Sequence, residues 1–144
     1  MRENIYRGKI KGQNTGNYEL DWAFGDLVRE LSTGKVFICD LSHFSDTTLL
    51  KDVLIEVDPE TVGKFTGLTD KNGRKNFEGD IICWKDWKAL ERVSAVTYDP
   101  EWNRFCVWLN GAQSMGVDKH LSQDIEIVGN RWDNPELLEV SNCN

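Results

Sequence analysis

Short apolar runs bounded by turn-forming residues recur along the chain, a pattern typical of β-strands. Residues 35–39 (KVFIC) and 53–57 (VLIEV) are rich in β-branched side chains, and each run predicts one strand. Proline restricts the residue before it to extended or turning backbone, so Asp58 and Pro59 predict a turn that leads into an extended run over residues 61–66. The first half of the chain therefore reads as strands joined by polar connections.

Two turn signals follow in the middle of the chain. Asn72 and Gly73 tolerate the positive φ angles of a type I′ turn, which matches the twist of two antiparallel strands and predicts a hairpin. A second tight turn is predicted at residues 78–80 (EGD), where acidic side chains are expected to accept backbone N–H groups. The tip of the predicted hairpin is expected to present three basic side chains to water, Lys71, Arg74 and Lys75.

The second half of the chain predicts a small barrel. Its short strands and tight turns fit a Src-homology-3-like or an OB-like barrel, and the short link over residues 118–123 favours the first, because it has room for a single 3₁₀ turn. Alternation places Phe105, Val107 and Leu109 on one face of their strand and Trp108 on the other. The predicted strands are residues 81–84, 93–98, 104–109, 113–117 and 125–128, with a hairpin turn at Asn110 and Gly111.

One helix start is convincing, at residues 133–136 (DNPE). Asn134 can cap the helix, Pro135 suits its first position, and Glu136 complements its dipole. The predicted fold is therefore all-β with a short C-terminal helix, in two small β subdomains. The expected parts are an N-terminal β subdomain over residues 1–78 that includes the Asn72–Gly73 hairpin, a five-stranded Src-homology-3-like β-barrel over residues 79–132, and a short helix with a frayed tail over residues 133–144.

Composition indicates a soluble globular protein. Of the 144 residues, 40% are hydrophobic and 28% charged, and no run approaches the ~20 apolar residues that span a bilayer. The N-terminus lacks the apolar segment of a secretory signal, so we expect residence in the cytoplasm and no membrane association. Three cysteines lie in apolar runs and are expected to be small buried hydrophobes: Cys39, Cys83 and Cys106.

Motifs for chemistry are lacking in the sequence. The two histidines, His43 and His120, lie in polar connections, and no GxSxG motif accompanies them. Asp40 and His43 supply only two ligands for a metal ion, too few for tight binding. The TDKNG segment resembles the opening of a calcium loop, but its glycine and the distal glutamate are out of register. We therefore expect no catalytic residues, no metal and no cofactor.

Tryptophans in turns provide the strongest functional signal. Trp87 lies in the polar run over residues 85–92 and Trp102 in the turn DPEWN, where aromatic side chains form binding faces. We expect both to contact a partner, with weaker support for Lys71, Arg74 and Lys75. The alternative is single-stranded nucleic-acid binding, with three tryptophans stacking on bases and three basic residues meeting phosphates. These would be Trp84, Trp87 and Trp108 with Lys85, Lys88 and Arg92.

The net charge disfavours this alternative. The chain carries −7, from 17 basic and 24 acidic residues, and phosphate backbones repel an acidic surface. The leading hypothesis is therefore a protein-interaction module that has no enzymatic activity. Its partner is expected to be a second copy of the chain, giving a homo-oligomer, or another protein.

Several segments resemble one family. Residues 56–84 (EVDPETVGKFTGLTDKNGRKNFEGDIICW) are similar to the signature of the YopX-like family of small phage and prophage proteins. IYRGKI near the start, WAFGDLV at residues 22–28 and IVGNRWDNPELLE at residues 127–139 also resemble it. The resemblance implies a phage- or prophage-encoded accessory protein with an all-β architecture. The cytoplasm would then be that of the bacterial host, and the partner, where it is not a second copy of the chain, a host or phage protein. It implies no assigned biochemical activity.

Overall fold

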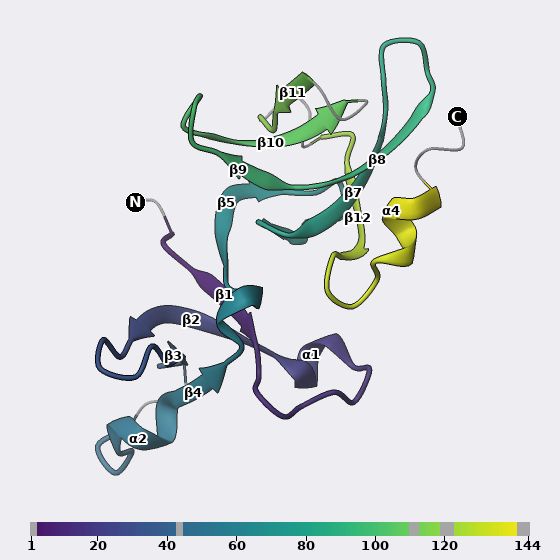
Figure 1. Cartoon of the computed structure of the whole chain (residues 1–144). Coiled ribbons are helices and arrows are strands. Elements are labelled where there is room, and N and C mark those ends of the chain that lie inside the picture. The colour runs from purple at the N-terminus through teal and green to yellow at the C-terminus, as the bar shows by residue number, and fades with distance from the viewer. Residues whose placement is uncertain (1–2, 43–44, 110–112, 119–122, 141–144) are drawn as a thin grey trace. The chain divides into compact units, whose positions relative to one another are not determined.

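The computed structural model describes residues 3–42, 45–109, 113–118 and 123–140. The chain is mostly β-structure with a short C-terminal helix (Figure 1), which confirms the predicted all-β class. Contacts group it into two compact units, unit 1 over Met1–Phe65 and unit 2 over Thr66–Asn144. The division predicted after residue 78 lies further along the chain and stays a prediction.

Unit 1 is built on four antiparallel strands in the order β4-β3-β2-β1. Val57 in β4 forms an isolated bridge with Ile10, just after β1, so the sheet curls until its two ends meet. A Cβ on Gly8 would lie 2.7 Å from Val57, and only glycine permits this closure. The strands are β1 (Tyr6–Lys9), β2 (Trp22–Arg29), β3 (Val36–Cys39) and β4 (Leu54–Val57), and the start of β5 (Gly63–Thr69) pairs with β1.

Alternation along these strands turns one set of apolar side chains toward the inside of unit 1. Its core contains Ala23, Val36, Ile38 and Val57. Two one-turn helices, α1 (Tyr18–Asp21) and α2 (Leu50–Val53), and the 3₁₀ turn η1 (Pro59–Thr61) connect the strands. The sequence reading missed both helices, because four residues are too few to show a helical period.

Unit 2 contains two three-stranded sheets, in the orders β12-β7-β8 and β11-β10-β9, and the β5–β6 hairpin. Its core is formed by Ile82, Trp84, Val96, Val107, Ile125 and Ile127. The strands are β6 (Lys75–Phe77), β7 (Asp80–Lys85), β8 (Glu91–Ala95), β9 (Thr97–Asp99), β10 (Arg104–Leu109), β11 (Gln113–Gly116) and β12 (Glu126–Asn130), followed by helix α4 (Glu136–Val140).

Most predicted elements of unit 2 are confirmed. Phe105 and Val107 pack on the core and Trp108 lies on the other face, as the alternation predicts. The predicted strand over residues 93–98 is instead divided at Val96 into β8 and β9. Residues 110–112 and 119–122 lie outside the described residues, so the turn at Asn110 and Gly111 and most of the 118–123 link do too. The Src-homology-3-like assignment stays a prediction.

Two predicted polar roles near the ends of unit 2 have different outcomes. The Asp80 carboxylate accepts the buried N–H of Phe77 at 2.7 Å, which confirms the capping role expected at residues 78–80. The side chain of Asn134, expected to cap α4, instead accepts the main-chain N–H of Asn130, which precedes the helix, at 3.2 Å.

Among the described residues, no helix is long and apolar enough to cross a membrane.

Candidate interaction surface

The turn between β7 and β8 is fixed by one carboxylate. Asp86 Oδ1 accepts the main-chain N–H groups of Lys88 at 2.8 Å and Leu90 at 3.0 Å. The main chain closes the same turn, because the Asp86 N–H donates to Leu90 O and the Ala89 N–H donates to Asp86 O, both at 2.9 Å. Ala89 adopts φ 60°, a conformation that favours glycine. We call residues 86–90 the Trp87 turn.

Trp87 projects from this turn into solvent. Its side chain is 88% exposed, and the Lys88 ammonium lies 4.7 Å from the centroid of its ring. Arg92 Nε pairs with Asp86 Oδ2 at 2.9 Å. Burial of the Asp86 carboxylate tends to raise its pKa, but hydrogen bonds from the Leu90 N–H and from Arg92 outweigh it and hold this pKa below its usual value. The turn therefore holds an exposed indole on a rigid, hydrogen-bonded base.

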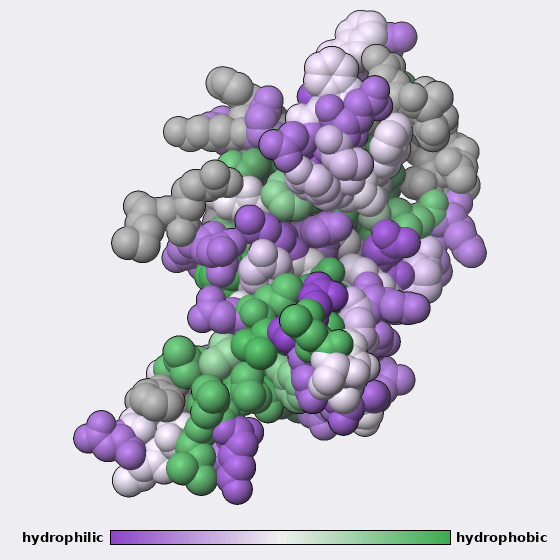
Figure 2. Space-filling model, turned by 60° about the vertical axis from the view of Figure 1, so that its left-hand side comes forward, coloured by the Kyte–Doolittle hydropathy of each residue, from purple (hydrophilic) through white to green (hydrophobic). Residues whose placement is uncertain are grey.

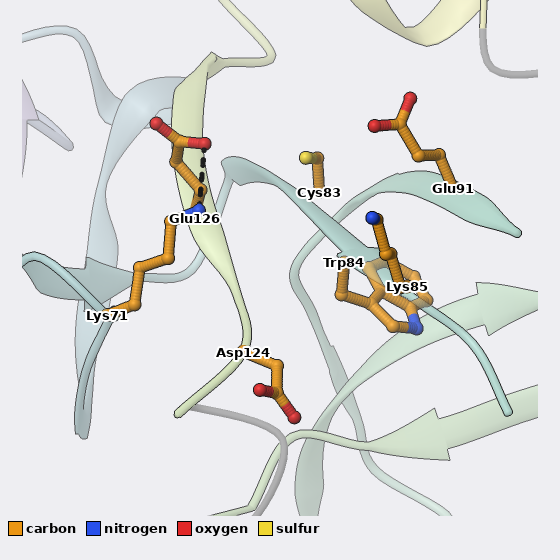
Figure 3. A pocket seen from close by; sticks show the side chains of 7 residues that line it. All are labelled: Lys71, Cys83, Trp84, Lys85, Glu91, Asp124 and Glu126. Carbon is orange, nitrogen blue, oxygen red and sulfur yellow. Dashed lines mark ion pairs between the residues drawn. The ribbon is translucent and has the colours of Figure 1, made fainter. Parts of the chain in front are cut away.

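A cavity of about 360 Å³ lies at the base of the same hairpin (Figure 3). Lys85 and Glu91, which face each other across β7 and β8, flank the Trp87 turn and line this cavity. Glu126 on β12 lies opposite Cys83 on β7. The full lining is Lys71, Cys83, Trp84, Lys85, Glu91, Asp124 and Glu126.

Charge dominates this lining. Figure 3 shows Lys71 and Glu126 reaching toward each other, and Lys71 Nζ lies 3.4 Å from Glu126 Oε2. Burial raises the pKa of the Cys83 thiol, and the carboxylates of Glu126 and Glu91 raise it further. The thiol is therefore protonated at neutral pH and is a poor nucleophile. The cavity therefore offers charged side chains and no activated nucleophile.

The described residues do not bring together the side chains that would bind a metal ion. Across residues 3–42, 45–109, 113–118 and 123–140, no group of three histidine, cysteine, aspartate or glutamate side chains comes together to hold one. His43 and His120 both lie outside these ranges.

Comparison with known proteins identifies the family. The YopX protein family matches residues 25–139, most of the chain. This chain belongs to the YopX protein family. A comparison with curated proteins finds no match.

Two solved structures share the fold. The protein YopX from Bacillus subtilis aligns with a TM-score of 0.54 at 18% identity, over 96% of this chain and 97% of that one. The protein EF1440 from Enterococcus faecalis aligns with a TM-score of 0.50 at 20% identity, over 94% of this chain and 96% of that one. The resemblance of residues 56–84 to the YopX-like family is thereby confirmed.

The basic residues predicted at the other hairpin are mostly engaged within this YopX-family chain. Lys71 pairs with Glu126, and Arg74 Nη1 lies 3.5 Å from the Ile127 carbonyl oxygen. Lys75 begins strand β6 and is exposed. These three side chains therefore do not form one free basic patch.

The predicted type I′ turn at this hairpin is wrong. Gly73 has φ 82°, but Asn72 does not adopt a positive φ. The physical cause is Asp70, whose Oδ1 accepts the N–H groups of Asn72 and Arg74, both at 2.9 Å. These bonds favour a type I turn with glycine following it in the left-handed region. The hairpin itself is confirmed.

Trp102, the second predicted contact residue, is 67% exposed in the turn between β9 and β10. Strands β8 and β9 run consecutively from Glu91 to Asp99, with the Trp87 turn before them and the Trp102 turn after them (Figure 1). The two tryptophans therefore lie in turns at opposite ends of the β8–β9 segment. Their contact with a partner stays a prediction.

The nucleic-acid alternative loses one of its three stacking residues. Trp84 is 4% exposed and packs in the core of unit 2, so a base cannot stack on it. Trp108 is 43% exposed, and its indole N–H donates to Thr97 Oγ1 at 3.0 Å. Arg92, expected to meet phosphates, pairs with Asp86.

Sequence reasoning missed the cavity. Cys83, expected to be a small buried hydrophobe, is half-buried and lines it, whereas Cys39 and Cys106 are buried as predicted. The period-two alternation of Cys83 and Lys85 was a usable signal, because it places both side chains on one face of β7. The contributions of Asp124 and Glu126 depend on the pairing of β12 with β7, which no local pattern specifies.

Exposed apolar side chains also occur in unit 1. Figure 2 shows hydrophobic residues gathered over the lower part of this view, and Leu41, Leu49 and Leu50 are each about half exposed or more. No aromatic side chain among the described residues of unit 1 is exposed to the same degree as Trp87. Much of the surface of a folded protein is apolar, and tryptophan is enriched among the residues that dominate interfaces, so Trp87 is the more informative feature.

Proposed function

We propose that this YopX-family chain is a phage- or prophage-encoded accessory protein of the bacterial cytoplasm that acts by binding another protein, without catalysis. The observation that carries this proposal is Trp87, 88% exposed on a turn whose main chain is fixed by Asp86. The phage origin rests on the resemblance of residues 56–84 to the signature of the YopX-like family of phage and prophage proteins.

The energetics of an exposed indole support a binding role. A buried tryptophan removes roughly 150–250 Å² from water, which at about 25 cal/mol per Å² corresponds to roughly 4–6 kcal/mol as an upper bound. Tryptophan is also enriched among the few interface residues that dominate affinity. Because the Asp86 carboxylate already fixes the Trp87 turn, little main-chain entropy is lost on binding.

The chemistry of the neighbouring cavity supports binding over catalysis. Its thiol, Cys83, has a raised pKa, and its carboxylates lie near lysines that neutralise part of their charge. Nucleophilic catalysis requires the opposite, a thiolate stabilised by positive charge or by an adjacent base.

Affinity capture from infected host cells tests this proposal. Tagged wild-type chain is expected to enrich a specific protein, and Trp87→Ala is expected to lose it. Leu31→Ala is the matched control, because Leu31 is 90% exposed in a turn of unit 1 and should leave capture unchanged. Failure to enrich any protein, or equal enrichment by the Trp87→Ala variant, would contradict the proposal.

A further inference from the structure

The Trp87 turn and the charged cavity belong to the same hairpin. Lys85 and Glu91, the residue pair that flanks the turn, also line the cavity. One copy of the chain therefore carries an exposed aromatic and cationic tip directly beside a recess rich in carboxylates.

We propose that this recess receives the Trp87 turn of a second copy of the chain, and that two copies exchange these turns reciprocally. This inference rests on the proposed protein-binding function and names its partner as the chain itself.

Charge complementarity favours this occupant. The tip carries Lys88, whose ammonium lies 4.7 Å from the Trp87 ring, so the cation and the indole enter together. Three carboxylates line the recess, those of Glu91, Asp124 and Glu126. Two lysines, Lys71 and Lys85, line the recess as well, and Lys71 pairs with Glu126, so the lining has an excess of one carboxylate for an incoming ammonium.

Size and symmetry are also compatible. The recess of about 360 Å³ falls within the roughly 300–1,000 Å³ of pockets that enclose organic ligands, enough for an indole. Since tip and recess are adjacent on one hairpin, a two-fold axis between two such hairpins lets each copy supply one tip and one recess.

The exchange predicts a weak dimer. Two indoles bury roughly 300–500 Å² of their own surface and a similar area of the recesses, in total about 600–1,000 Å², which is below the ~1,200 Å² of a stable specific interface. We therefore expect weak association, with a dissociation constant on the order of 10–100 μM. The chain should therefore be monomeric at low concentration and increasingly dimeric above that range, at an ionic strength of about 0.15 M that screens the repulsion between two acidic copies.

Sedimentation velocity of the full chain tests the dimer. Over about 5–500 μM, the wild type and the Leu31→Ala control are expected to show a rising average mass, and Trp87→Ala a constant monomer mass. Lys88→Glu should weaken association at least about tenfold, and Glu91→Lys in the same chain should restore part of it. A wild type that stays monomeric, or a Trp87→Ala variant that dimerises equally, overturns the inference.

Cys83 provides a direct geometric readout, because it lines the recess. In a background that also carries Cys143→Ser, Lys88→Cys keeps the Trp87 indole and is expected to form an intermolecular disulfide with Cys83 when diamide takes up the two electrons and two protons released. A disulfide within one chain would leave the mass of the chain unchanged, so a cross-linked dimer reports contact between two copies. The matched control is Leu31→Cys, which should not cross-link.

The two proposals fail differently. Absence of the cross-linked dimer, or its persistence after Cys83→Ser, overturns the exchange of turns. A monomeric chain that still captures a host or phage protein through Trp87 overturns self-association and leaves the proposed binding function standing. A dimer that loses its cross-link with Cys83→Ser supports both.

Discussion

Two hairpin turns of unit 2 have the same pattern of hydrogen bonds but differ in what surrounds them. Residues 70–74 and the Trp87 turn at 86–90 each begin with an aspartate that accepts the N–H groups two and four residues later. Both also close with a main-chain bond from the N–H of the first residue to the carbonyl of the fifth. The difference lies in the second carboxylate oxygen and in the residue that takes the left-handed conformation.

The first turn packs against β12, whereas the second projects into solvent. Asp70 Oδ2 accepts the N–H of Ile127 at 3.1 Å, and the Lys71 N–H donates to Ile125 O at 3.0 Å, so residues 70–74 lie against β12. Asp86 Oδ2 instead pairs with Arg92 of its own hairpin. The same local geometry therefore serves attachment in one turn and display of Trp87 in the other.

The largest expected effect is on the docked turn. Asp70→Ala removes three hydrogen bonds to a carboxylate and leaves the buried Ile127 N–H without an acceptor, so we expect a loss of about 3 kcal/mol in the free energy of unfolding. Urea denaturation followed by tryptophan fluorescence measures it. Asp86→Ala is the matched variant and should lose less, since both N–H groups freed at Oδ1 lie in an exposed turn. Equal losses in the two variants would show that docking on β12 adds no stability.

The next largest effect is expected at Gly73 and Ala89, the residues in the left-handed conformation. Substitutions there should change the free energy of unfolding in opposite directions. Gly73→Ala should destabilise by about 1 kcal/mol, because its Cβ meets no atom within 4 Å and only the conformational penalty remains. Ala89→Gly should stabilise by a few tenths up to about 1 kcal/mol, since glycine relieves that penalty but has greater freedom when unfolded. Chemical denaturation of both variants measures the two changes in the free energy of unfolding. A stabilising Gly73→Ala would refute this account of the turns.

The smallest effect is the dependence of the Trp87 turn on acid. Because the pKa of Asp86 is lowered in the folded chain, its contribution to stability is fully present above its unfolded pKa near 3.8 and is lost as pH falls through the lowered value. Asp86→Asn keeps an acceptor oxygen but has no charge to lose. The difference in unfolding free energy between the two chains should be constant from pH 5 to 7 and shrink below about pH 4. A difference that stays constant down to pH 2.5 would argue against this role of the charge.

The sequence predicted where strands and turns lie better than it predicted how the turns are made. The runs at residues 35–39, 53–57 and 104–109 carry strong β-branched or alternating patterns, and each became a strand. The turn at Asn72 and Gly73 was placed correctly, but its type depends on the Asp70 carboxylate, which the dipeptide signal does not include. Local patterns locate an element, whereas side-chain hydrogen bonds determine its geometry.

The candidate site was only partly predictable for a related reason. Exposure of Trp87 follows from its place in a short polar turn. The recess beside it combines three separate segments, around Lys71, over residues 83–91 and at residues 124–126. Their proximity depends on the β12–β7 register and on its shift between Ile127 and Gly129, which are long-range features.

The attachment of Asp70 to Ile127 has a consequence for the behaviour of the chain at high concentration. β12 is the terminal strand of its sheet, and its outward N–H at Ile127 is occupied by this carboxylate. An unoccupied strand edge is a template for open-ended polymerisation and fibre growth. The same aspartate that shapes a turn therefore also occupies a backbone donor through which a further strand could add to this edge.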